Sequence, residues 1–327
     1  MILAGDIGGT KTNLAFFETN GSEVGPIIKQ RTFRSADYDS LEGILKEFVD
    51  DTELITSACF GIAAPVVQGH AKTPNLNWTV NAESLAQVLE IDRVGLINDL
   101  EATARGISTL NDSQLLTLNA GDPKRGGDRA LIAAGTGLGV AGIFFRDGEY
   151  EFIPSEGGHV DFAPRTELEI ELLRYLMEKF ASHVSYERVL SGPGFLNLYY
   201  FLRDRKYAEE PAWLAQEIES GNKAAAIAKA ALANKSELAV KALDMFVSIY
   251  GAMAGNLALL MMSMGGLYVG GGIAPKILEK LKDGTFMRAF SYKGRFSSLL
   301  ASFPVYVILD DKTALFGAAR GALDPSG

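Results

Sequence analysis

The sequence predicts an α/β protein of two lobes, and three observations support this fold class. The chain has 327 residues, which exceeds the size at which a single hydrophobic core usually stops growing. A pattern of strand, glycine turn and strand occurs twice, at residues 3–24 and 131–152. After each copy, apolar runs of strand length alternate with helical patterns, as in layered α/β folds. We therefore expect two lobes that each begin with a three-stranded β-meander.

The two copies of this pattern share the same order of features. "LAGDIGGTKTNLAFFETNGSEV" and "LIAAGTGLGVAGIFFRDGEYEF" each place two apolar strands around glycines, followed by a hairpin turn and a third strand. The turn pairs Asn20-Gly21 and Asp147-Gly148 are typical of tight hairpins, which need residues that tolerate positive φ. Similarity between two segments of one chain indicates a duplicated unit.

The segment after the first meander reads as alternating helices and buried strands. Apolar residues recur at helical spacing in "SLEGILKEFVD", and Asn81 is an N-cap signal for the next helix. The expected elements are a helix at 40–50, a strand at 55–65, a helix at 81–90, a strand at 93–99 and a helix at 100–108.

The segment after the second meander reads as mostly helical. Thr166 and Glu169 have the spacing of a capping box at the start of a helix. Further along, we expect an alanine-rich helix at 223–234, a long buried helix, a strand at 305–310 and a helix of small residues at 313–323. The expected domains are residues 1–110 plus 304–327, and residues 111–303.

Composition narrows the class of partner. The net charge is −9 with a pI near 5.0, and no basic cluster interrupts it, so we expect small molecules and neither nucleic acid nor an anionic membrane. Cys59 is the only cysteine, which excludes an internal disulfide framework and a zinc site of several cysteines. With no export signal at the N-terminus, the expected location is the cytoplasm.

One segment has the length of a membrane span, because no charged residue occurs between Asp244 and Lys276. The glycine pair 265–266 and the run 270–272 divide it into a helix, a short strand and a turn. We therefore interpret this segment as the core of the second lobe.

The glycine turns are candidate phosphate-binding loops, because backbone N–H groups can converge on an anion where no Cβ interferes. The first turn lacks the spacing of a P-loop, and "GTGLG" lacks the third glycine and the helix of a dinucleotide fingerprint. A third turn, "GGGIAPK", follows a buried strand and could approach a flat ligand. The expected nucleotide-binding residues are Asp6, Gly8, Gly9, Thr10, Lys11, Gly135, Thr136, Gly137, Gly271 and Gly272.

Polar residues near the other turns are candidates for binding a second ligand. Asn98 and Asp99 lie where a strand ends and a helix begins, which is where ligands bind in α/β sheets. A simpler alternative is that Asp99 only caps the helix. Glu156, His159 and Glu187 lie beside glycines. The simpler alternative for His159 is a core histidine, and for Glu187 a solvated acid at a helix end.

Seven motifs occur in an order that resembles the bacterial-type glucokinases of the sugar kinase/Hsp70/actin superfamily. They are "GDIGGT", "LINDLEATA", "GTGLGV", "EGGHVDFAP", "ERVLSGPG", "GNLAL" and "GGGIAPK". The resemblance covers essentially the whole chain, and "EGGHVDFAP" with "ERVLSGPG" is its most specific part. It implies a ribonuclease H-like/actin-like ATPase fold with duplicated βββαβαβα units and a cleft between the lobes. Related repressor-like sugar kinases carry a cysteine cluster that binds zinc, whereas this chain does not, so no zinc is expected.

The resemblance implies ATP-dependent phosphorylation of D-glucose at the 6-hydroxyl, with Mg²⁺ as cofactor and a homodimer as the assembly. A carboxylate is deprotonated at neutral pH and can accept the hydroxyl proton, so Asp99 is the expected catalytic base. Asp6 is the expected carboxylate beside Mg²⁺, through water. The expected sugar-binding residues are Asn98, Asp99, Glu156, His159 and Glu187.

Three alternatives stay open at this stage. The same fold could phosphorylate mannose, fructose or an amino sugar, because the sequence gives the hydroxyl-binding groups without their geometry. A sugar-sensing regulator would need a DNA-binding module, for which we expect no room before Asp6. An actin-like assembly protein would not need Glu156, His159 and Glu187.

Overall fold

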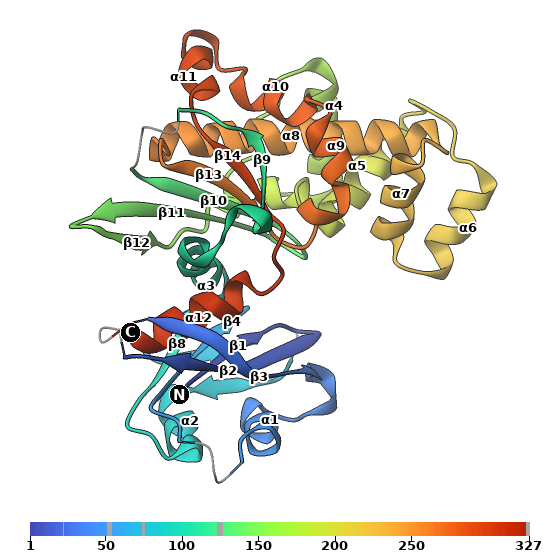
Figure 1. Cartoon of the computed structure of the whole chain (residues 1–327). Helices are drawn as coiled ribbons and strands as arrows, with labels where there is room; N and C mark the ends of the chain where they lie inside the picture. The colour runs from blue at the N-terminus through green and yellow to red at the C-terminus, as the bar shows by residue number, and fades with distance from the viewer. Residues whose placement is uncertain (22, 51–53, 74–75, 123–126, 325–327) are drawn as a thin grey trace. The chain divides into compact units, whose positions relative to one another are not determined.

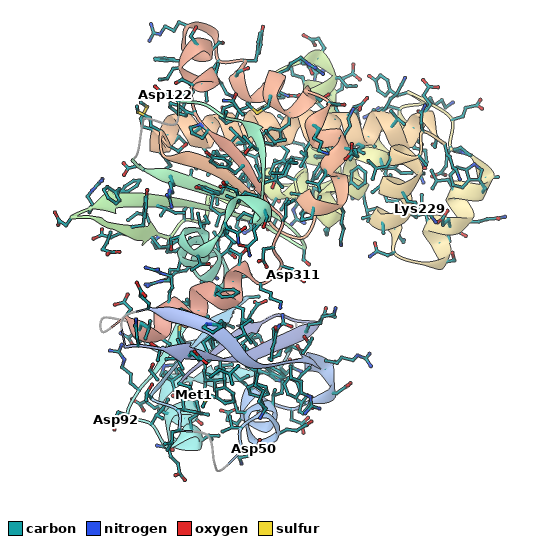
Figure 2. All side chains as sticks on the ribbon, in the orientation of Figure 1. Met1, Asp50, Asp92, Asp122, Lys229 and Asp311 are labelled. Atoms are coloured by element: carbon teal, nitrogen blue, oxygen red, sulfur yellow. The ribbon has the colours of Figure 1, made fainter. Side chains whose placement is uncertain are left out.

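The computed structural model describes all residues except 22, 51–53, 74–75, 123–126 and 325–327. The chain forms two compact units (Figure 1). Unit 1 comprises Met1–Gln114 together with the C-terminal segment from Asp310, and unit 2 comprises Leu115–Leu309. Figure 2 shows the described side chains on both units.

Unit 1 is built on a five-stranded sheet with the order β3-β2-β1-β4-β8. Antiparallel pairing joins β1 to β2 and β2 to β3, whereas β1, β4 and β8 are parallel. A small separate sheet contains β5, β6 and β7. The strands are β1 (Ile2–Ile7), β2 (Lys11–Thr19), β3 (Val24–Arg34), β4 (Ser57–Ile62), β5 (Val66–Val67), β6 (His70–Lys72), β7 (Thr79–Asn81) and β8 (Val94–Asn98).

Unit 2 repeats this arrangement in a six-stranded sheet with the order β12-β11-β10-β13-β14-β9. Here β10, β11 and β12 form the antiparallel meander, β10 pairs in parallel with β13, and β13 pairs in parallel with β14. The strands are β9 (Leu115–Asn119), β10 (Arg129–Ala134), β11 (Leu138–Arg146), β12 (Glu149–Ile153), β13 (Gly266–Gly270) and β14 (Val305–Ile308). The duplicated β-meander predicted from the sequence is therefore confirmed, while β9 was not predicted.

Helices cover both faces of the unit 1 sheet (Figure 1). Alternate residues of β1 face opposite sides of the sheet, as strand geometry requires. Leu3 packs with residues of α1 and α2, whereas Ile2 and Ala4 pack with residues of α12. The helices of this unit are α1 (Leu41–Phe48), α2 (Ala82–Leu89), α3 (Asp99–Gly106) and α12 (Thr313–Leu323).

The long helix α8 (Glu237–Met261) is the centre of the unit 2 core. Its Tyr250 hydroxyl contacts the β10 backbone, accepting from the Ala134 N–H at 3.3 Å. Within the described chain, α8 is the one helix long and apolar enough to cross a membrane, but 72% of its most apolar window is buried inside the unit, as in a core helix. The other helices are α4 (Glu167–Phe180), α5 (Gly192–Asp204), α6 (Ala212–Ser220), α7 (Lys223–Leu232), α9 (Leu278–Lys282), α10 (Thr285–Ser291) and α11 (Ser297–Ala301).

Short 3₁₀ helices complete the two units. They are η1 (Ser35–Asp37), η2 (Ile107–Thr109), η3 (Asp112–Gln114), η4 (Gly157–His159), η5 (Tyr186–Arg188), η6 (Ala274–Ile277) and η7 (Gly294–Phe296).

Two local predictions need correction. The expected capping box of α4 is only half formed: the Thr166 hydroxyl accepts from the Glu169 N–H, but the Glu169 carboxylate accepts from the backbone and side chain of Arg165. The predicted start of the returning C-terminal segment, at residue 304, is too early. β14 pairs with β13 and β9 of unit 2, and the segment joins unit 1 only at Asp310.

The small-residue helix predicted near the C-terminus is α12, and it lies against α3 at close range. A Cβ on Gly317 would be 1.6 Å from the Ala102 carbonyl oxygen, and a Cβ on Gly106 would be 2.0 Å from that of Thr313. The two helices therefore depend on glycine at their contact.

We predict that Gly317→Ala lowers the melting temperature by at least about 3 °C, because the added methyl group forces α3 and α12 apart. The matched control is Gly43→Ala in α1, where the nearest atom to an added Cβ is 3.8 Å away. Alanine is favoured over glycine in a helix by roughly 0.5–1 kcal/mol, so the control should keep or raise the melting temperature. Calorimetry on both variants checks the pair, and equal effects would contradict the packing argument.

Candidate active site

Three of the predicted site residues lie at one edge of the unit 1 sheet. Asp6 is near the carboxyl end of β1, and Asn98 and Asp99 lie where β8 ends and α3 begins. β1 and β8 are both parallel to β4, which lies between them, so their carboxyl ends meet at the same edge. Gly61 of β4 separates the two sides: it pairs with Asp6, and its added Cβ would be 4.0 Å from the Asp99 Cα.

The Asp6 side chain is partly buried, and its carboxylate accepts a hydrogen bond from the neighbouring strand β2. The Asn13 amide donates to Asp6 Oδ2 at 3.3 Å, and the Thr32 hydroxyl in turn donates to Asn13 Oδ1 at 2.7 Å. Burial raises the pKa of Asp6 to about 6; the Asn13 hydrogen bond opposes this shift, and the Asp99 and Asp311 carboxylates add to it. Negative charge is therefore concentrated at this edge of the sheet.

Asn98 and Asp99 have different local roles. Asn98 is the N-cap of α3, because its Oδ1 accepts from the Leu100 N–H at 2.9 Å. The simpler interpretation, that Asp99 caps this helix, is therefore wrong, because the cap is the preceding residue, Asn98. Asp99 is the first residue of the helix, where its Oδ1 also accepts from the Leu100 N–H at 2.9 Å. Burial raises the pKa of Asp99, and this hydrogen bond opposes the shift.

The first glycine turn is closed by its own backbone and braced by Ser35, the first residue of η1. The Gly8 N–H donates to the Lys11 carbonyl at 2.9 Å, so this N–H is not available to a phosphate. Buried Ser35 donates its hydroxyl to the Gly8 carbonyl at 2.8 Å and its N–H to the Thr10 carbonyl at 3.1 Å. Thr10 and Lys11 are exposed, and Lys11 begins β2.

The second glycine turn has the same closure. The Gly135 N–H donates to the Gly137 carbonyl at 2.9 Å, and the Gly192 N–H donates to the Gly135 carbonyl at 2.8 Å. An added Cβ on Gly137 would be 2.6 Å from Glu187 Oε2, so this glycine lets Glu187 approach the turn. Glu187 Oε2 also accepts from the Leu138 N–H at 3.0 Å.

The third glycine turn lies beside the second. Gly271 has a φ of +82°, and an added Cβ would be 2.3 Å from the Ala134 carbonyl oxygen, so only glycine fits there. Gly272 and Thr136 border a cavity of about 590 Å³ within unit 2. Cavities of about 300–1,000 Å³ are typical of small-molecule sites. Its lining includes Gly135, Thr136, Gly192, Pro193, Phe195, Asn222, Lys223, Ala225, Ala228, Gly272 and Lys276.

Glu156, His159 and Glu187 lie on two adjoining segments of unit 2. Glu156 forms a parallel bridge with Val140, and the His159 N–H donates to the Glu156 carbonyl at 2.9 Å. The segments that follow pair through Asp161 and Ser185. His159 is exposed, so the alternative of a core histidine is wrong, and Glu187 is partly buried, so it is not a solvated helix-end acid.

The polar side chains at the unit 1 edge and on the two unit 2 segments carry groups that can bind sugar hydroxyls, and the glycine turns can bind a phosphate chain. Carboxylates, an amide and an imidazole supply both acceptors and donors for hydroxyl groups. Glycine turns next to a cavity can receive a nucleotide.

Comparison with known proteins decides the family. A family model described as Glucokinase matches residues 3–324. The chain belongs to the glucokinase family. A glucokinase from Nostoc sp. is 44% identical to it over 98% of both chains.

Solved structures agree with this assignment. The glucokinase of an Antarctic psychrotroph is 31% identical, covers 98% of both chains and superposes with a TM-score of 0.83. A ROK family glucokinase from Streptomyces griseus, in complex with glucose and AMPPNP, shares the fold at 21% identity, 98% coverage of both chains and a TM-score of 0.64. The predicted family, fold class and enzyme class are therefore confirmed.

Three polar residues that lie near Asp6 or the first glycine turn were not predicted from the sequence. Asp311, labelled in Figure 2, lies near enough to affect the pKa of Asp6. Its signal was present, because "VILDD" ends a strand in acids just as "LIND" does. Asn13 and Ser35 gave no such signal, since their contacts cross between strands that only the fold brings together.

We predict that Asp6→Asn stabilises the chain, and more so as the pH rises from 5 to 8. The pKa of Asp6 is raised on folding, so its contribution to stability is full below its unfolded value and is lost as the pH rises through about 6. The difference between 3.8 and about 6 corresponds to at most about 3 kcal/mol at pH 8. Urea midpoints measured with a metal chelator at several pH values check this, and a stability difference independent of pH would contradict it.

Proposed function

We propose that this enzyme transfers the γ-phosphoryl group of ATP to the 6-hydroxyl of D-glucose, with Asp99 as the catalytic base. The observation that carries the assignment of the base is the partly buried Asp99 carboxylate at the carboxyl edge of the unit 1 sheet, in a chain of the glucokinase family. The products are glucose 6-phosphate and ADP, which enter glycolysis and the nucleotide pool.

The chemistry needs an oriented hydroxyl and a place for its proton. As the bond from O6 to the γ-phosphorus forms and the bond from phosphorus to the ADP oxygen breaks, the O6 proton moves to the Asp99 carboxylate. Asp99 is fixed for this role because the Leu100 N–H holds Oδ1 at 2.9 Å, which leaves Oδ2 for the sugar. Its raised pKa makes it a better proton acceptor than an exposed aspartate.

The residues assigned to the sugar hydroxyls are Asn98, Asp99, Glu156, His159 and Glu187. A site that pairs each hydroxyl rejects analogues that lack one, because its own buried polar groups would then lose their partners. Glucose is therefore favoured over deoxy sugars; mannose, fructose and amino sugars are the competing substrates, and a substrate panel separates them.

The nucleotide is assigned to the glycine turns and the unit 2 cavity. Gly9, Thr10, Thr136 and Gly137 face the phosphates, since Gly8 and Gly135 use their N–H groups to close the turns. The adenosine part occupies the cavity bordered by Gly272, with Gly271 holding the backbone in shape beneath it. Lys11 is an accessory residue at the first turn.

Mg²⁺ is the expected metal, and the residues at the unit 1 edge fit a hydrated ion. Mg²⁺ keeps several waters and takes one or two carboxylates plus phosphate oxygens. The described residues contain no group of three or more His, Cys, Asp or Glu side chains arranged around an ion, whereas the Asp6 carboxylate is flanked by the charges of Asp99 and Asp311. Asp6 would hold the ion through water, and the bound ion would neutralise charge on the phosphates.

We also infer a cytoplasmic location and a homodimer. The location is supported by the single cysteine. The acidic sequence, which no basic cluster interrupts, argues against nucleic acid as a partner. The homodimer is supported by resemblance to the family.

We predict that Asp99→Asn lowers kcat by at least about 100-fold, because the amide still accepts from Leu100 but cannot take the proton. The glucose KM should change much less. Coupled detection of ADP with Mg²⁺-ATP and glucose measures both values. The matched control is Glu101→Gln, which removes a carboxylate from the same helix where it pairs with Arg105. Near-full turnover by Asp99→Asn would refute the assignment of the base.

We predict that Ala228→Phe raises the KM for ATP several-fold and leaves the KM for glucose within about twofold, because the larger side chain fills the cavity. Lys229→Phe is the control on the same helix, since Lys229 projects into solvent with 80% of its side chain exposed (Figure 2). Equal effects of the two substitutions on ATP would show that the nucleotide does not occupy this cavity.

A further inference from the structure

The motif "GNLAL" lies in α8 and contains none of the residues assigned to glucose, ATP or Mg²⁺. Its second residue, Asn256, instead contacts the 3₁₀ turn that carries Glu187. We propose that Asn256 and Tyr186 are positioning residues that hold the two sugar-binding segments of unit 2 on helix α8. This inference rests on the proposed function, because it concerns the same sugar site.

Tyr186 joins the two sugar-binding segments to each other. Its N–H donates to the Val160 carbonyl at 3.0 Å, and its ring packs edge-on against Phe162 at 5.7 Å between centroids. Its hydroxyl interacts with the Ala163 backbone. The residue is 3% exposed and precedes Glu187 directly, so any movement of Tyr186 moves the Glu187 backbone.

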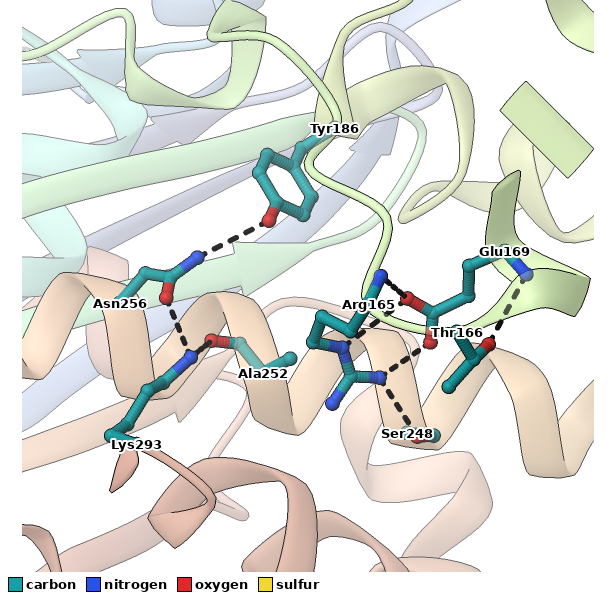
Figure 3. Close-up of polar contacts among 8 residues, drawn as sticks. All are labelled: Arg165, Thr166, Glu169, Tyr186, Ser248, Ala252, Asn256 and Lys293. Carbon is teal, nitrogen blue, oxygen red and sulfur yellow. Dashed lines mark hydrogen bonds and ion pairs between the residues drawn. The ribbon is translucent and has the colours of Figure 1, made fainter. Parts of the chain in front are cut away.

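Asn256 connects the 3₁₀ turn that carries Tyr186 to α8 (Figure 3). Its amide nitrogen donates to the Tyr186 hydroxyl oxygen at 3.2 Å. Lys293 donates to Asn256 Oδ1 at 2.6 Å and to the Ala252 carbonyl at 3.0 Å. An ammonium group has donors only, so it must face the amide oxygen, and this fixes the amide nitrogen toward Tyr186.

Lys293 keeps this role at neutral pH. Burial and the nearby Arg165 guanidinium lower its pKa to about 8, while the Glu169 carboxylate opposes the shift. The group is therefore mostly protonated at pH 7 and can donate to Asn256 and Ala252 together.

Gly255 explains why the motif pairs glycine with asparagine. An added Cβ would be 2.3 Å from the Phe290 carbonyl oxygen and 2.9 Å from Lys293 Cε. Glycine at this position lets the segment after α10 approach α8, and this approach delivers the Lys293 ammonium to Asn256.

A second anchor lies on the same stripe of α8 (Figure 3). Ser248, Ala252 and Asn256 are four residues apart, so they lie on one face of the helix. Arg165, which follows the His159 segment, donates to the Ser248 hydroxyl at 3.0 Å and to the Glu169 carboxylate at 2.6 Å. One helix face therefore contacts both segments, through Arg165 and through Tyr186.

The consequence for the sugar passes through Glu187. Its Oε2 accepts a hydrogen bond from the Leu138 N–H at 3.0 Å, beside the second glycine turn. Oε1 is left to bind a hydroxyl group. A small shift of the turn changes the angle of that second oxygen. Catalysis and binding are sensitive to displacements of this size.

Tyr186→Phe and Asn256→Ala test the proposal in the full-length enzyme. We expect each to raise the Kd for glucose, measured by calorimetry without ATP, and the KM for glucose by about three- to tenfold, with the KM for ATP within about twofold. Because both variants remove the hydrogen bond between Asn256 and Tyr186, their effects on glucose affinity should not add: the double variant should bind glucose about as well as the weaker-binding single variant. Lys293→Met should show the same pattern to a smaller degree.

Tyr199→Phe is the matched control. Tyr199 is a fully buried tyrosine of α5 in the same core, so it reports what loss of a buried hydroxyl does to stability alone. Should Tyr186→Phe and Asn256→Ala leave glucose affinity unchanged, or change it no more than Tyr199→Phe at equal melting temperature, the proposal is overturned while the function stands. Wild-type enzyme that forms no ADP with any hexose would instead overturn the proposed function, and glucose affinity in the variants would still decide the positioning role.

Discussion

Parallel pairing of three strands is the constraint on which the rest of each unit depends. Parallel neighbours cannot be joined by a tight hairpin, so helices must cross over between β1, β4 and β8 and cover the sheet. The same pairing brings the carboxyl ends of these strands to one edge, where Asp6, Asn98 and Asp99 lie. Repetition of the pattern in β10, β13 and β14 brings the second and third glycine turns together in unit 2.

This arrangement places the carboxylates of Asp6 and Asp99 where their ionisation lowers the stability of the folded chain. Burial raises the pKa of Asp6 and Asp99, so ionisation of either carboxylate at neutral pH destabilises the folded chain. This cost agrees with the roles proposed for the two residues, since a carboxylate with a raised pKa is a better base and an accumulation of negative charge attracts a divalent ion. Hydrogen bonds from Asn13 and Leu100 limit the cost and fix one oxygen of each carboxylate.

Residues outside the proposed ligand-binding set hold the segments to which we assign ligand binding. Ser35 braces the first glycine turn, and Asn13 holds Asp6. In unit 2, the polar stripe of α8 contacts the segments of His159 and Glu187 through Arg165 and Tyr186. Buried polar groups are expensive unless paired, and each of these is paired with a residue distant in the chain.

The sequence by itself determined the duplicated meanders, most helices and strands, and the family, because periodicity, turn residues and motifs are local signals. It also predicted roles for Asp99 and for the three sugar candidates of unit 2, since each stands in a motif, and these roles stay predictions. It could not find Asn13, Ser35 or the partner of Asn256, because those contacts join residues whose separation along the chain carries no pattern. Only the tertiary structure decided that Asn98 and not Asp99 caps α3, that Gly8 and Gly135 use their own N–H groups, and that β14 belongs to unit 2. Each of these depends on which polar groups meet after folding, and hydrogen bonds form between atoms in space regardless of their order in sequence.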